Sequence, residues 1–308
     1  KLWAVRGDTG ESLFSDSSHP IAQGDARVAV GDIDGDGLPE IVLPRNDQNN
    51  PGILMYDHNG NLKWDNAAAV SAWNSSHVFG YWTTISSIST PVIADLTHDG
   101  KPEIIVRSTV VDSFDGSISW AREMTTGMDL SYPASTIADL DLDGNQEIIA
   151  GNKAYNSDGT LKWWNSSVQV GFNVVGNFND DPYPEIVLET HSSGVPLPVI
   201  YLLDHKGNIK WGPVYVKNLD PTDGWTQTIC SPIIADFDGD GEPEIGVSGW
   251  NNYYVLDKNG NLKQTYHIPG DTAFAPSSAA TVFDLNGDGR PEVLINANGY
   301  FRIFDGKS

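Results

Sequence analysis

The stretch Asp32-Ile-Asp-Gly-Asp-Gly-Leu-Pro-Glu40 decides the organisation of this 308-residue chain, because the chain repeats it in six variants. Oxygen-bearing side chains recur at loop positions 1, 3, 5 and 9, and glycine stands at position 6 in five of the six copies. A repeat this regular indicates one equivalent structural unit per copy. The other copies are Asp95–Glu103, Asp139–Glu147, Asn177–Glu185, Asp236–Glu244 and Asp284–Glu292.

The chemistry of the loop suits calcium. Ca²⁺ prefers about six to eight oxygen ligands, which carboxylates and a backbone carbonyl supply from one tight loop. Glycine at position 6 permits the sharp turn that returns position 9 to the ion. An EF-hand would need its acid at position 12 and helices on both sides, whereas short apolar runs such as Glu103-Ile-Ile-Val106 flank these loops. We therefore expect up to six Ca²⁺ ions, each bound where two strands connect.

The predicted calcium ligands are the residues at positions 1, 3, 5, 7 and 9, with position 7 acting through its carbonyl oxygen. Loop by loop they are Asp32, Asp34, Asp36, Leu38, Glu40; Asp95, Thr97, Asp99, Lys101, Glu103; Asp139, Asp141, Asp143, Asn145, Glu147; Asn177, Asn179, Asp181, Tyr183, Glu185; Asp236, Asp238, Asp240, Glu242, Glu244; and Asp284, Asn286, Asp288, Arg290, Glu292. The fourth loop has amides at positions 1 and 3 and Pro182 at position 6, so we expect it to bind calcium weakly or not at all.

A second pattern follows each loop and completes the unit. Segments such as Tyr56-Asp-His-Asn-Gly-Asn-Leu-Lys-Trp64 place Asn-Gly or Asp-Gly between apolar residues, which is typical of a β-hairpin. Each unit then has four strands, as a propeller blade does. The fold class is therefore all-β: a six-bladed β-propeller with a calcium loop in each blade. We expect one domain, 1–308, whose N-terminal strand 1–5 supplies the last strand of the last blade and closes the ring. The tryptophans at the ends of these units, Trp3, Trp64, Trp120, Trp163 and Trp211, are interpreted as packing residues.

The amino-acid composition disfavours some classes of binding partner. The formal net charge is −23, with 41 acidic and 18 basic residues, which disfavours nucleic acid and anionic membranes as ligands. We expect no membrane insertion, since no apolar run approaches about 18 residues. Loops of this kind need calcium near the millimolar range, so we expect an extracellular protein, secreted or at a cell surface. We expect a monomer or one part of a larger multidomain chain. Cys230, the one cysteine, is interpreted as a buried, inert thiol.

The loops and their flanking strands resemble the FG-GAP/VCBS repeat, which occurs in the integrin α-subunit propeller and in many bacterial surface proteins. The resemblance extends over essentially the whole chain. It implies a propeller with structural calcium loops and with ligand on the opposite face; many bacterial members are carbohydrate-binding or adhesive. The hairpins that end in Lys-Trp are also similar to the propeller of rhamnogalacturonan lyases, which are usually longer and carry an extra β-domain.

The face opposite the calcium loops is expected to bind the ligand. The long irregular segments lie between the second and third strands of a unit or between units, and long loops on a rigid scaffold commonly bind ligands. Several of them carry aromatic side chains, whose rings can cover the apolar face of a sugar. The alternative is that these aromatic residues form small cores beneath their own loops. The candidate ligand-binding residues are Trp73, Phe79, Tyr81, Trp82, Tyr132, Trp225 and Trp250.

Three functions are compatible with these features. The first is a calcium-stabilised, lectin-like module that binds carbohydrate. The second is an adhesion or scaffold propeller of a cell-surface protein, for which Arg6-Gly-Asp8 is a possible adhesive tripeptide. The third is a pectic polysaccharide lyase, which would need a base and a cation. Its candidate groups, which no spacing ties together, are His77, Arg107, Arg122, His191, Lys217 and His267. We expect a binding module rather than an enzyme, and we assign no catalytic residue.

Overall fold

The computed structural model describes residues 1–19, 28–45, 52–67, 90–106, 108–122, 135–191, 198–219, 231–249, 251–268, 280–297 and 300–305. These residues form antiparallel sheets with almost no helix, so the predicted all-β class is confirmed. The chain divides into two compact units. The first comprises 1–139, 143–150 and 155–162, and the second comprises 140–142, 151–154 and 163–308.

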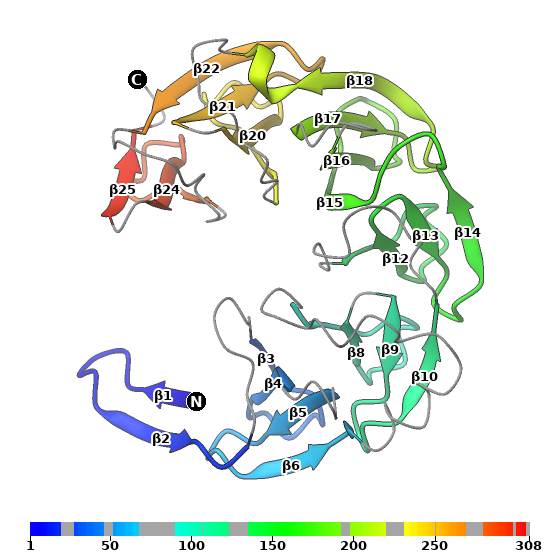
Figure 1. Ribbon diagram of the computed structural model, residues 1–308, viewed down its shortest axis with the longest axis vertical. Coiled ribbons are helices and arrows are strands. Elements are labelled where there is room, and N and C mark those ends of the chain that lie inside the picture. Colours follow the sequence, from blue (N-terminus) through cyan, green and yellow to red (C-terminus); the bar gives the residue numbers. More distant parts are fainter. Residues whose placement is uncertain are drawn as a thin grey trace. The chain divides into compact units, whose positions relative to one another are not determined.

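The first unit begins with a two-stranded sheet, which is followed by four-stranded ones (Figure 1). Its strands are β1 (Leu2–Val5) and β2 (Ser12–Asp16); β3 (Ala29–Gly31), β4 (Glu40–Arg45), β5 (Gly52–Tyr56) and β6 (Leu62–Asp65); and β7 (Val92–Ala94), β8 (Glu103–Val106), β9 (Thr109–Val111) and β10 (Ile118–Ala121). The next sheet has residues in both units and consists of β11 (Thr136–Ala138), β12 (Glu147–Ala150), β13 (Lys153–Tyr155) and β14 (Leu161–Trp164).

The second unit continues the same pattern and ends with a three-stranded sheet. Its strands are β15 (Gly171–Gly176), β16 (Glu185–His191), β17 (Pro198–Leu203) and β18 (Ile209–Tyr215), followed by the 3-10 helix η2 (Val216–Asn218); β19 (Ile233–Ala235), β20 (Glu244–Ser248), β21 (Asn252–Leu256) and β22 (Leu262–His267); and β23 (Thr281–Phe283), β24 (Glu292–Ala297) and β25 (Tyr300–Phe304).

Strand order within every sheet follows the chain, so neighbouring strands are antiparallel hairpins. In the sheet β3-β4-β5-β6, for example, Ala29 pairs with Val42 and Val42 pairs with Met55. Because alternate hairpin connections lie at opposite ends of such a sheet, the acidic loop between the first two strands and the Asn-Gly turn between the last two share one end. The predicted four-stranded unit, with the acidic loop inside its first hairpin, is confirmed for these sheets.

Apolar side chains pack between successive sheets. In the first unit, Val42 and Met55 lie in one buried cluster with Ile104 and Val106 of the next sheet. In the second unit, Val187 and Ile200 pack with residues of β20 and β21 in the same way. The second and third strands carry continuous runs of Val, Ile and Leu because sheets cover both of their faces. Each fully buried Val, Ile or Leu contributes roughly 1.5–3 kcal/mol to folding.

A tryptophan in each of the strands β6, β10, β14 and β18 connects its sheet to the next. The indole N–H of Trp64 donates to the carbonyl oxygen of Ser113, 3.1 Å away, in the turn of the following sheet. Trp120, Trp163 and Trp211 donate to turn carbonyls in the same manner, at 2.9–3.0 Å. The ring also lies over the glycine of that turn: a Cβ on Gly116 would come within 2.8 Å of Trp64. The expectation that these tryptophans serve packing is confirmed.

The N-terminal strand differs from its predicted role. Val5 and its neighbours in β1 pair with β2, and this pairing was not expected from the sequence. Phe14 of β2 covers the turn glycine Gly60, which is the contact that fourth-strand tryptophans make elsewhere. Trp3 was expected to fill that position, but its side chain is exposed and donates through Nε1 to Ser12 Oγ. Closure of a ring by residues 1–5 stays a prediction.

Candidate metal centres

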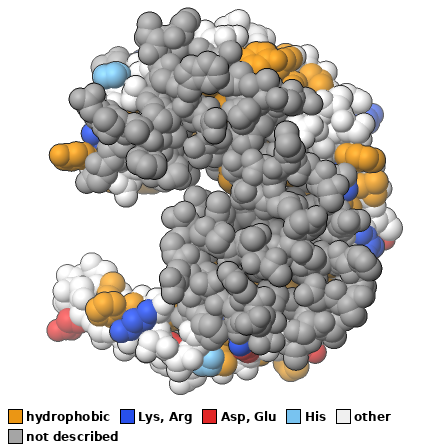
Figure 2. Space-filling model, viewed as in Figure 1, with side chains coloured by type: hydrophobic (Ala, Val, Ile, Leu, Met, Phe, Trp, Pro, Cys, Tyr) orange, Lys and Arg blue, Asp and Glu red, His pale blue; other side chains and the backbone are white. Residues whose placement is uncertain are grey.

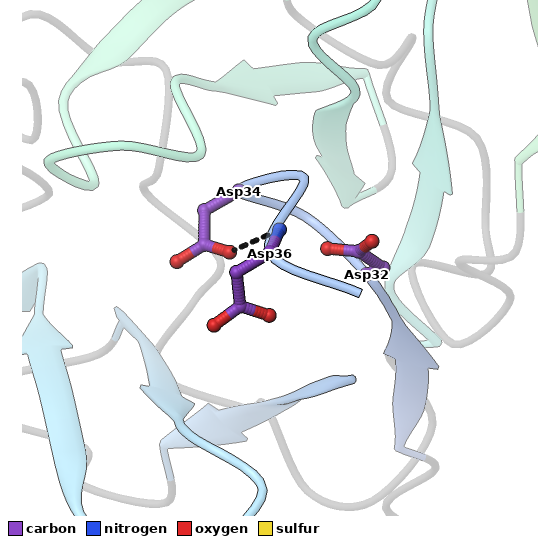
Figure 3. A group of neighbouring side chains, drawn as sticks. All are labelled: Asp32, Asp34 and Asp36. Atoms are coloured by element: carbon purple, nitrogen blue, oxygen red, sulfur yellow. Dashed lines mark hydrogen bonds between the residues drawn. The ribbon is translucent and has the colours of Figure 1, made fainter. Parts of the chain in front are cut away.

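The first acidic loop brings three carboxylates together. Asp32, Asp34 and Asp36 each offer an oxygen, and these oxygens lie within 4.8 Å of one another. Figure 3 shows the three side chains projecting from a single tight turn, with the amide N–H of Asp36 donating to Asp34 Oδ1 at 3.2 Å. All three residues are exposed, so the oxygens are open to solvent. The sequence predicted this grouping from the spacing alone.

The fifth loop forms an equivalent group from its first, third and last positions. Asp236, Asp238 and Glu244 offer oxygens within 4.8 Å of one another. Glu244 is buried at the start of β20, whereas the two aspartates are partly buried. A set of hard carboxylate oxygens is the donor chemistry that Ca²⁺ prefers. The residues present therefore fit the predicted ion in both loops.

Backbone amides fix the carboxylate at position 1. In the fifth loop, Gly239 N–H donates to Asp236 Oδ1 at 2.7 Å, and Gly241 N–H donates to Asp236 Oδ2 at 2.8 Å. The amide of the position 6 glycine makes the same bond in the first, second, third and sixth loops, at 2.8–3.0 Å. A carboxylate accepts about four hydrogen bonds, so lone pairs remain for a cation. The loop is thus shaped before any ion binds.

The position 9 glutamate is hydrogen-bonded to the backbone at the start of its own loop. Its Oε2 accepts the amide N–H of position 2, at 2.9 Å from Ile33 to Glu40 and at 2.9 Å from Phe237 to Glu244. The second, fourth and sixth loops repeat this bond at 2.7–3.0 Å. One oxygen of a buried glutamate is therefore committed to the backbone. The sequence placed this residue among the ligands but did not reveal its structural role.

Lysines of the fourth strands reach the remaining glutamate oxygen. Lys63 Nζ lies 3.3 Å from Glu40 Oε1 and 2.5 Å from Asp34 Oδ2. In the other sheets Lys162, Lys210 and Lys263 lie 2.7–3.1 Å from Oε1 of Glu147, Glu185 and Glu244 respectively. The Lys-Trp pairs are visible in the sequence, but no role was predicted for these lysines. Their spacing, one residue before the packing tryptophan in three copies and before Gln264 in a fourth, could have indicated it.

The second loop has no such lysine, because Ser119 precedes Trp120. Burial raises the pKa of Glu103, and the nearby charges of Asp99 and Asp95 add to the effect, against a hydrogen bond from the Leu96 amide. In the first loop, by contrast, the hydrogen bond from Lys63 lowers the pKa of Asp34. Burial likewise raises the pKa of Glu244 in the fifth loop, although Lys263 contacts that residue.

A positive φ is required at position 4 as well as at position 6. Gly35, Gly239 and Gly287 occupy position 4 with φ of 74–77°. His98 and Leu142 stand at the same position in the second and third loops with φ of 56° and 62°, a conformation that side chains disfavour. The need for a positive φ at position 4 was not predicted, although glycine stands there in three of the six copies.

The fourth loop has a different internal chemistry. No residue from Asn177 to Glu185 has a positive φ, as Pro182 at position 6 requires. Asn179 Nδ2 donates to Glu185 Oε1, and Asn177 Nδ2 donates to the Asp181 carbonyl oxygen at 3.0 Å. The Asn179 amide occupies a glutamate oxygen that a cation would use, as Asn286 Nδ2 does with Glu292 Oε1 at 2.9 Å in the sixth loop. The amide at position 1 and the absence of positive φ are therefore what set the fourth loop apart. This geometry favours the prediction that the fourth loop binds calcium weakly or not at all.

The predicted aromatic ligand site lies outside the described residues. Figure 2 draws such residues in grey, and hydrophobic side chains of described residues also reach the surface in that view. The seven candidates that lie outside are Trp73, Phe79, Tyr81, Trp82, Tyr132, Trp225 and Trp250. Cys230 is outside them too. The assignment of these residues to ligand stays a prediction.

The candidate acid–base groups are only partly described, since His77 and Arg107 lie outside. Arg122 packs over the Trp120 ring and donates through Nε to the Gly159 carbonyl oxygen at 2.7 Å. His191 ends β16, Lys217 lies in η2, and His267 Nδ1 lies 3.1 Å from Asn252 Oδ1 at the end of β22. Arg122 and His267 thus each have a structural contact.

In the tripeptide Arg6-Gly-Asp8, the arginine and aspartate side chains bond to each other. Arg6 donates through Nε and Nη2 to the two carboxylate oxygens of Asp8, at 3.0 and 2.9 Å, in the turn between β1 and β2. This bond lowers the pKa of Asp8.

Among the described residues, no helix is both long and apolar enough to cross a membrane.

Comparison with known proteins supports the repeat and the fold. A family model described as an FG-GAP-like repeat matches residues 32–106 and 236–295, which contain the first, second, fifth and sixth loops. The chain thus contains FG-GAP-like repeats. No curated protein matches the sequence.

Solved structures have a similar fold at low sequence identity. The Vibrio cholerae biofilm matrix protein Bap1 matches with a TM-score of 0.71 and 16% identity, over 99% of this chain and 72% of that chain. BBS1N, solved in complex with ARL6DN, matches with a TM-score of 0.54 and 10% identity, over 98% of this chain and 83% of that chain. The rhamnogalacturonan lyase YesW scores 0.48 with 15% identity, over 98% and 68%, a likeness too low to carry an argument. The fold is β-propeller-like.

Proposed function

We propose that this chain of FG-GAP-like repeats is an extracellular, calcium-stabilised binding module. The observation that carries the proposal is the convergence of carboxylate oxygens in the first and fifth loops, within 4.8 Å of one another. Bringing such charges together costs free energy unless a cation compensates them. Asp32, Asp34 and Asp36 would hold one ion, and Asp236, Asp238 and Glu244 another. A bound ion would supply positive charge that rigidifies the loop.

Each sheet is proposed to be a blade of a six-bladed propeller, closed by residues 1–5. The second, third and sixth loops would take further ions through the ligands given above, and the fourth would take none. The structural role of the calcium follows from its place inside the first hairpin of each sheet, at the end where the Asn-Gly turn also lies. The opposite end of the sheets would then carry the ligand site.

Carbohydrate is the ligand class that we propose. The candidate residues Trp73, Trp82 and Trp225 lie in long segments that connect strands at that opposite end, and Trp250 lies in the short connection between β20 and β21. Indole rings suit the apolar faces of sugars. The likeness in fold to a biofilm matrix protein fits a module that acts outside the cell. The net charge of −23 argues against a polyuronate and hence against a pectic lyase.

Binding to an array of glycans and plant polysaccharides, with millimolar calcium and again with a chelator, tests this function. A calcium-dependent signal on one sugar class is expected. Trp82→Ala and Trp225→Ala should abolish it without changing the melting temperature. Trp164→Ala is the matched control, because that tryptophan is exposed on β14 and lies outside the candidate set. A blank array would instead favour a protein ligand and an adhesive role.

A further inference from the structure

The fourth-strand lysines place a positive charge among the predicted calcium ligands. Lys263 Nζ lies 2.6 Å from Asp238 Oδ2, 3.1 Å from Asp240 Oδ2 and 2.8 Å from Glu244 Oε1. These carboxylates stand at positions 3, 5 and 9 of the fifth loop. One ammonium group thus contacts three of the four side chains that the sequence assigns to the ion.

The same arrangement recurs in the first loop. Lys63 Nζ contacts Asp34 at position 3 and Glu40 at position 9. Glu40 and Glu244 are both buried, and an ammonium ion reduces the electrostatic cost of keeping a buried carboxylate charged. The lysine therefore performs, with one charge, part of what a divalent cation would do in the loop.

The second loop provides an internal contrast. Ser119 stands where Lys63 and Lys263 stand in their sheets, and no ion pair to Glu103 is present among the described residues. The loop still keeps the Asp95 carboxylate bonded to the Gly100 amide at 2.8 Å, so its shape matches the others. It differs in having no lysine at this fourth-strand position, and also in Thr97 at position 3 and Lys101 at position 7.

We propose that Lys63 and Lys263 are tethered cations that hold their loops in shape without calcium and compete with calcium for the same carboxylates. The inference rests on the proposed calcium binding. It divides the loops into two classes: the first and fifth, which have such a lysine, keep their shape without calcium, and the second, which has none, depends on calcium for its shape. The propeller would then respond to calcium loop by loop.

The amide of the position 6 glycine allows each loop to be observed alone. Gly100 and Gly241 donate to the position 1 aspartate of their own loops, so their amide resonances report on those loops. Calcium titrations of the full chain, followed by NMR, give an apparent Kd at each glycine. Each variant is compared with the wild-type Kd of the same loop, because Thr97 leaves the second loop with one carboxylate fewer than the fifth.

Lys263→Met keeps the length of the side chain but removes its charge. It should lower the apparent Kd at Gly241 by about three- to thirtyfold, since two or three ion pairs no longer oppose the metal. The metal-free melting temperature should fall, and saturating calcium should restore it. Lys258→Met is the matched control, because the one ion pair that Lys258 forms among the described residues is with the exposed Glu242 side chain at position 7, at 2.5 Å. It should leave the Kd at Gly241 within about twofold.

Ser119→Lys tests the converse and should raise the apparent Kd at Gly100. An unchanged or weaker affinity at Gly241 in Lys263→Met, with wild-type resonances elsewhere, would overturn the inference and leave calcium binding intact. Absence of any calcium-induced shift at either glycine in the wild-type chain would instead overturn the proposed function, and the tethered cations with it.

Discussion

Trp211 and Gly260 lie in contact across two neighbouring sheets of the second unit. The indole N–H of Trp211 donates to the Lys258 carbonyl oxygen at 2.9 Å, and its ring covers the α-carbon of Gly260 in the same turn. Gly260 has a φ of 81°, and a Cβ there would lie 3.0 Å from the ring. Glycine is therefore required at position 260 for two reasons: the positive φ and the close contact with the Trp211 ring.

Gly260→Ala should destabilise the fold by about 2–4 kcal/mol, because it adds strain at positive φ and pushes the Trp211 ring away. Chemical denaturation measures this loss. Gly10→Ala is the matched control: Gly10 has a φ of 72° but no atom near its Cβ position, so it should cost only about 1–2 kcal/mol. Equal losses in the two variants would show that the ring contact contributes nothing.

The Asp204 turn predicts a dependence of stability on acid. Burial acts to raise the pKa of Asp204, but hydrogen bonds from the Asn208 side chain and from the Asn208 and Lys206 amides outweigh it and lower the pKa. The folded pKa thus lies below the unfolded value of about 3.9, so the stabilisation is complete above that pH and is lost as the pH falls below it.

Asp204→Asn should therefore lower the melting temperature at pH 7 and reduce its further fall below about pH 4. Thermal melts in chelator, from pH 7 to pH 2.5, provide the comparison. The sheet β11-β12-β13-β14 carries the uncharged Asn156 at the same turn position, and the backbone N–H of Asn156 donates to the Thr160 carbonyl oxygen at 2.9 Å, so asparagine is compatible with the turn. A variant whose melts parallel the wild type across the whole range would refute the assignment.

The fourth and fifth loops should differ in their response to calcium. Asp240→Asn removes a position 5 carboxylate from the fifth loop and should reduce the calcium-induced rise in stability. A site saturated at a hundredfold excess over its Kd contributes about 2.7 kcal/mol, which sets the scale of the loss. Asp181→Asn makes the same change in the fourth loop and should leave the calcium response unaltered. A loss of similar size in both variants would mean that the fourth loop binds calcium too.

Much of the architecture could be predicted from the sequence because the repeat carries it. The spacing of Asp32, Asp34 and Asp36, and the Asn-Gly turns that follow, each require a hairpin, so the four-stranded sheets follow from local chemistry. The packing role predicted for Trp3 was wrong. An aromatic residue near the end of a strand does not reveal which strand packs on the next turn, and in the structure Phe14 of β2 makes the contact with Gly60.

The lysines were missed for a related reason. Lys63 and Asp34 are far apart in the sequence and meet only because the two hairpins of one sheet share an end. The ion pair therefore depends on sheet topology, which no single motif contains. The aromatic ligand site cannot be judged in the same way, since its seven residues lie outside those that the structure describes.

Calorimetric titration of the metal-free chain with CaCl₂ measures calcium binding itself. We expect saturable binding of more than one ion per chain, with fewer ions bound when Asp32 and Asp236 are both changed to alanine. A titration that shows no saturable heat up to several millimolar calcium, together with identical melts in calcium and in chelator, would contradict it.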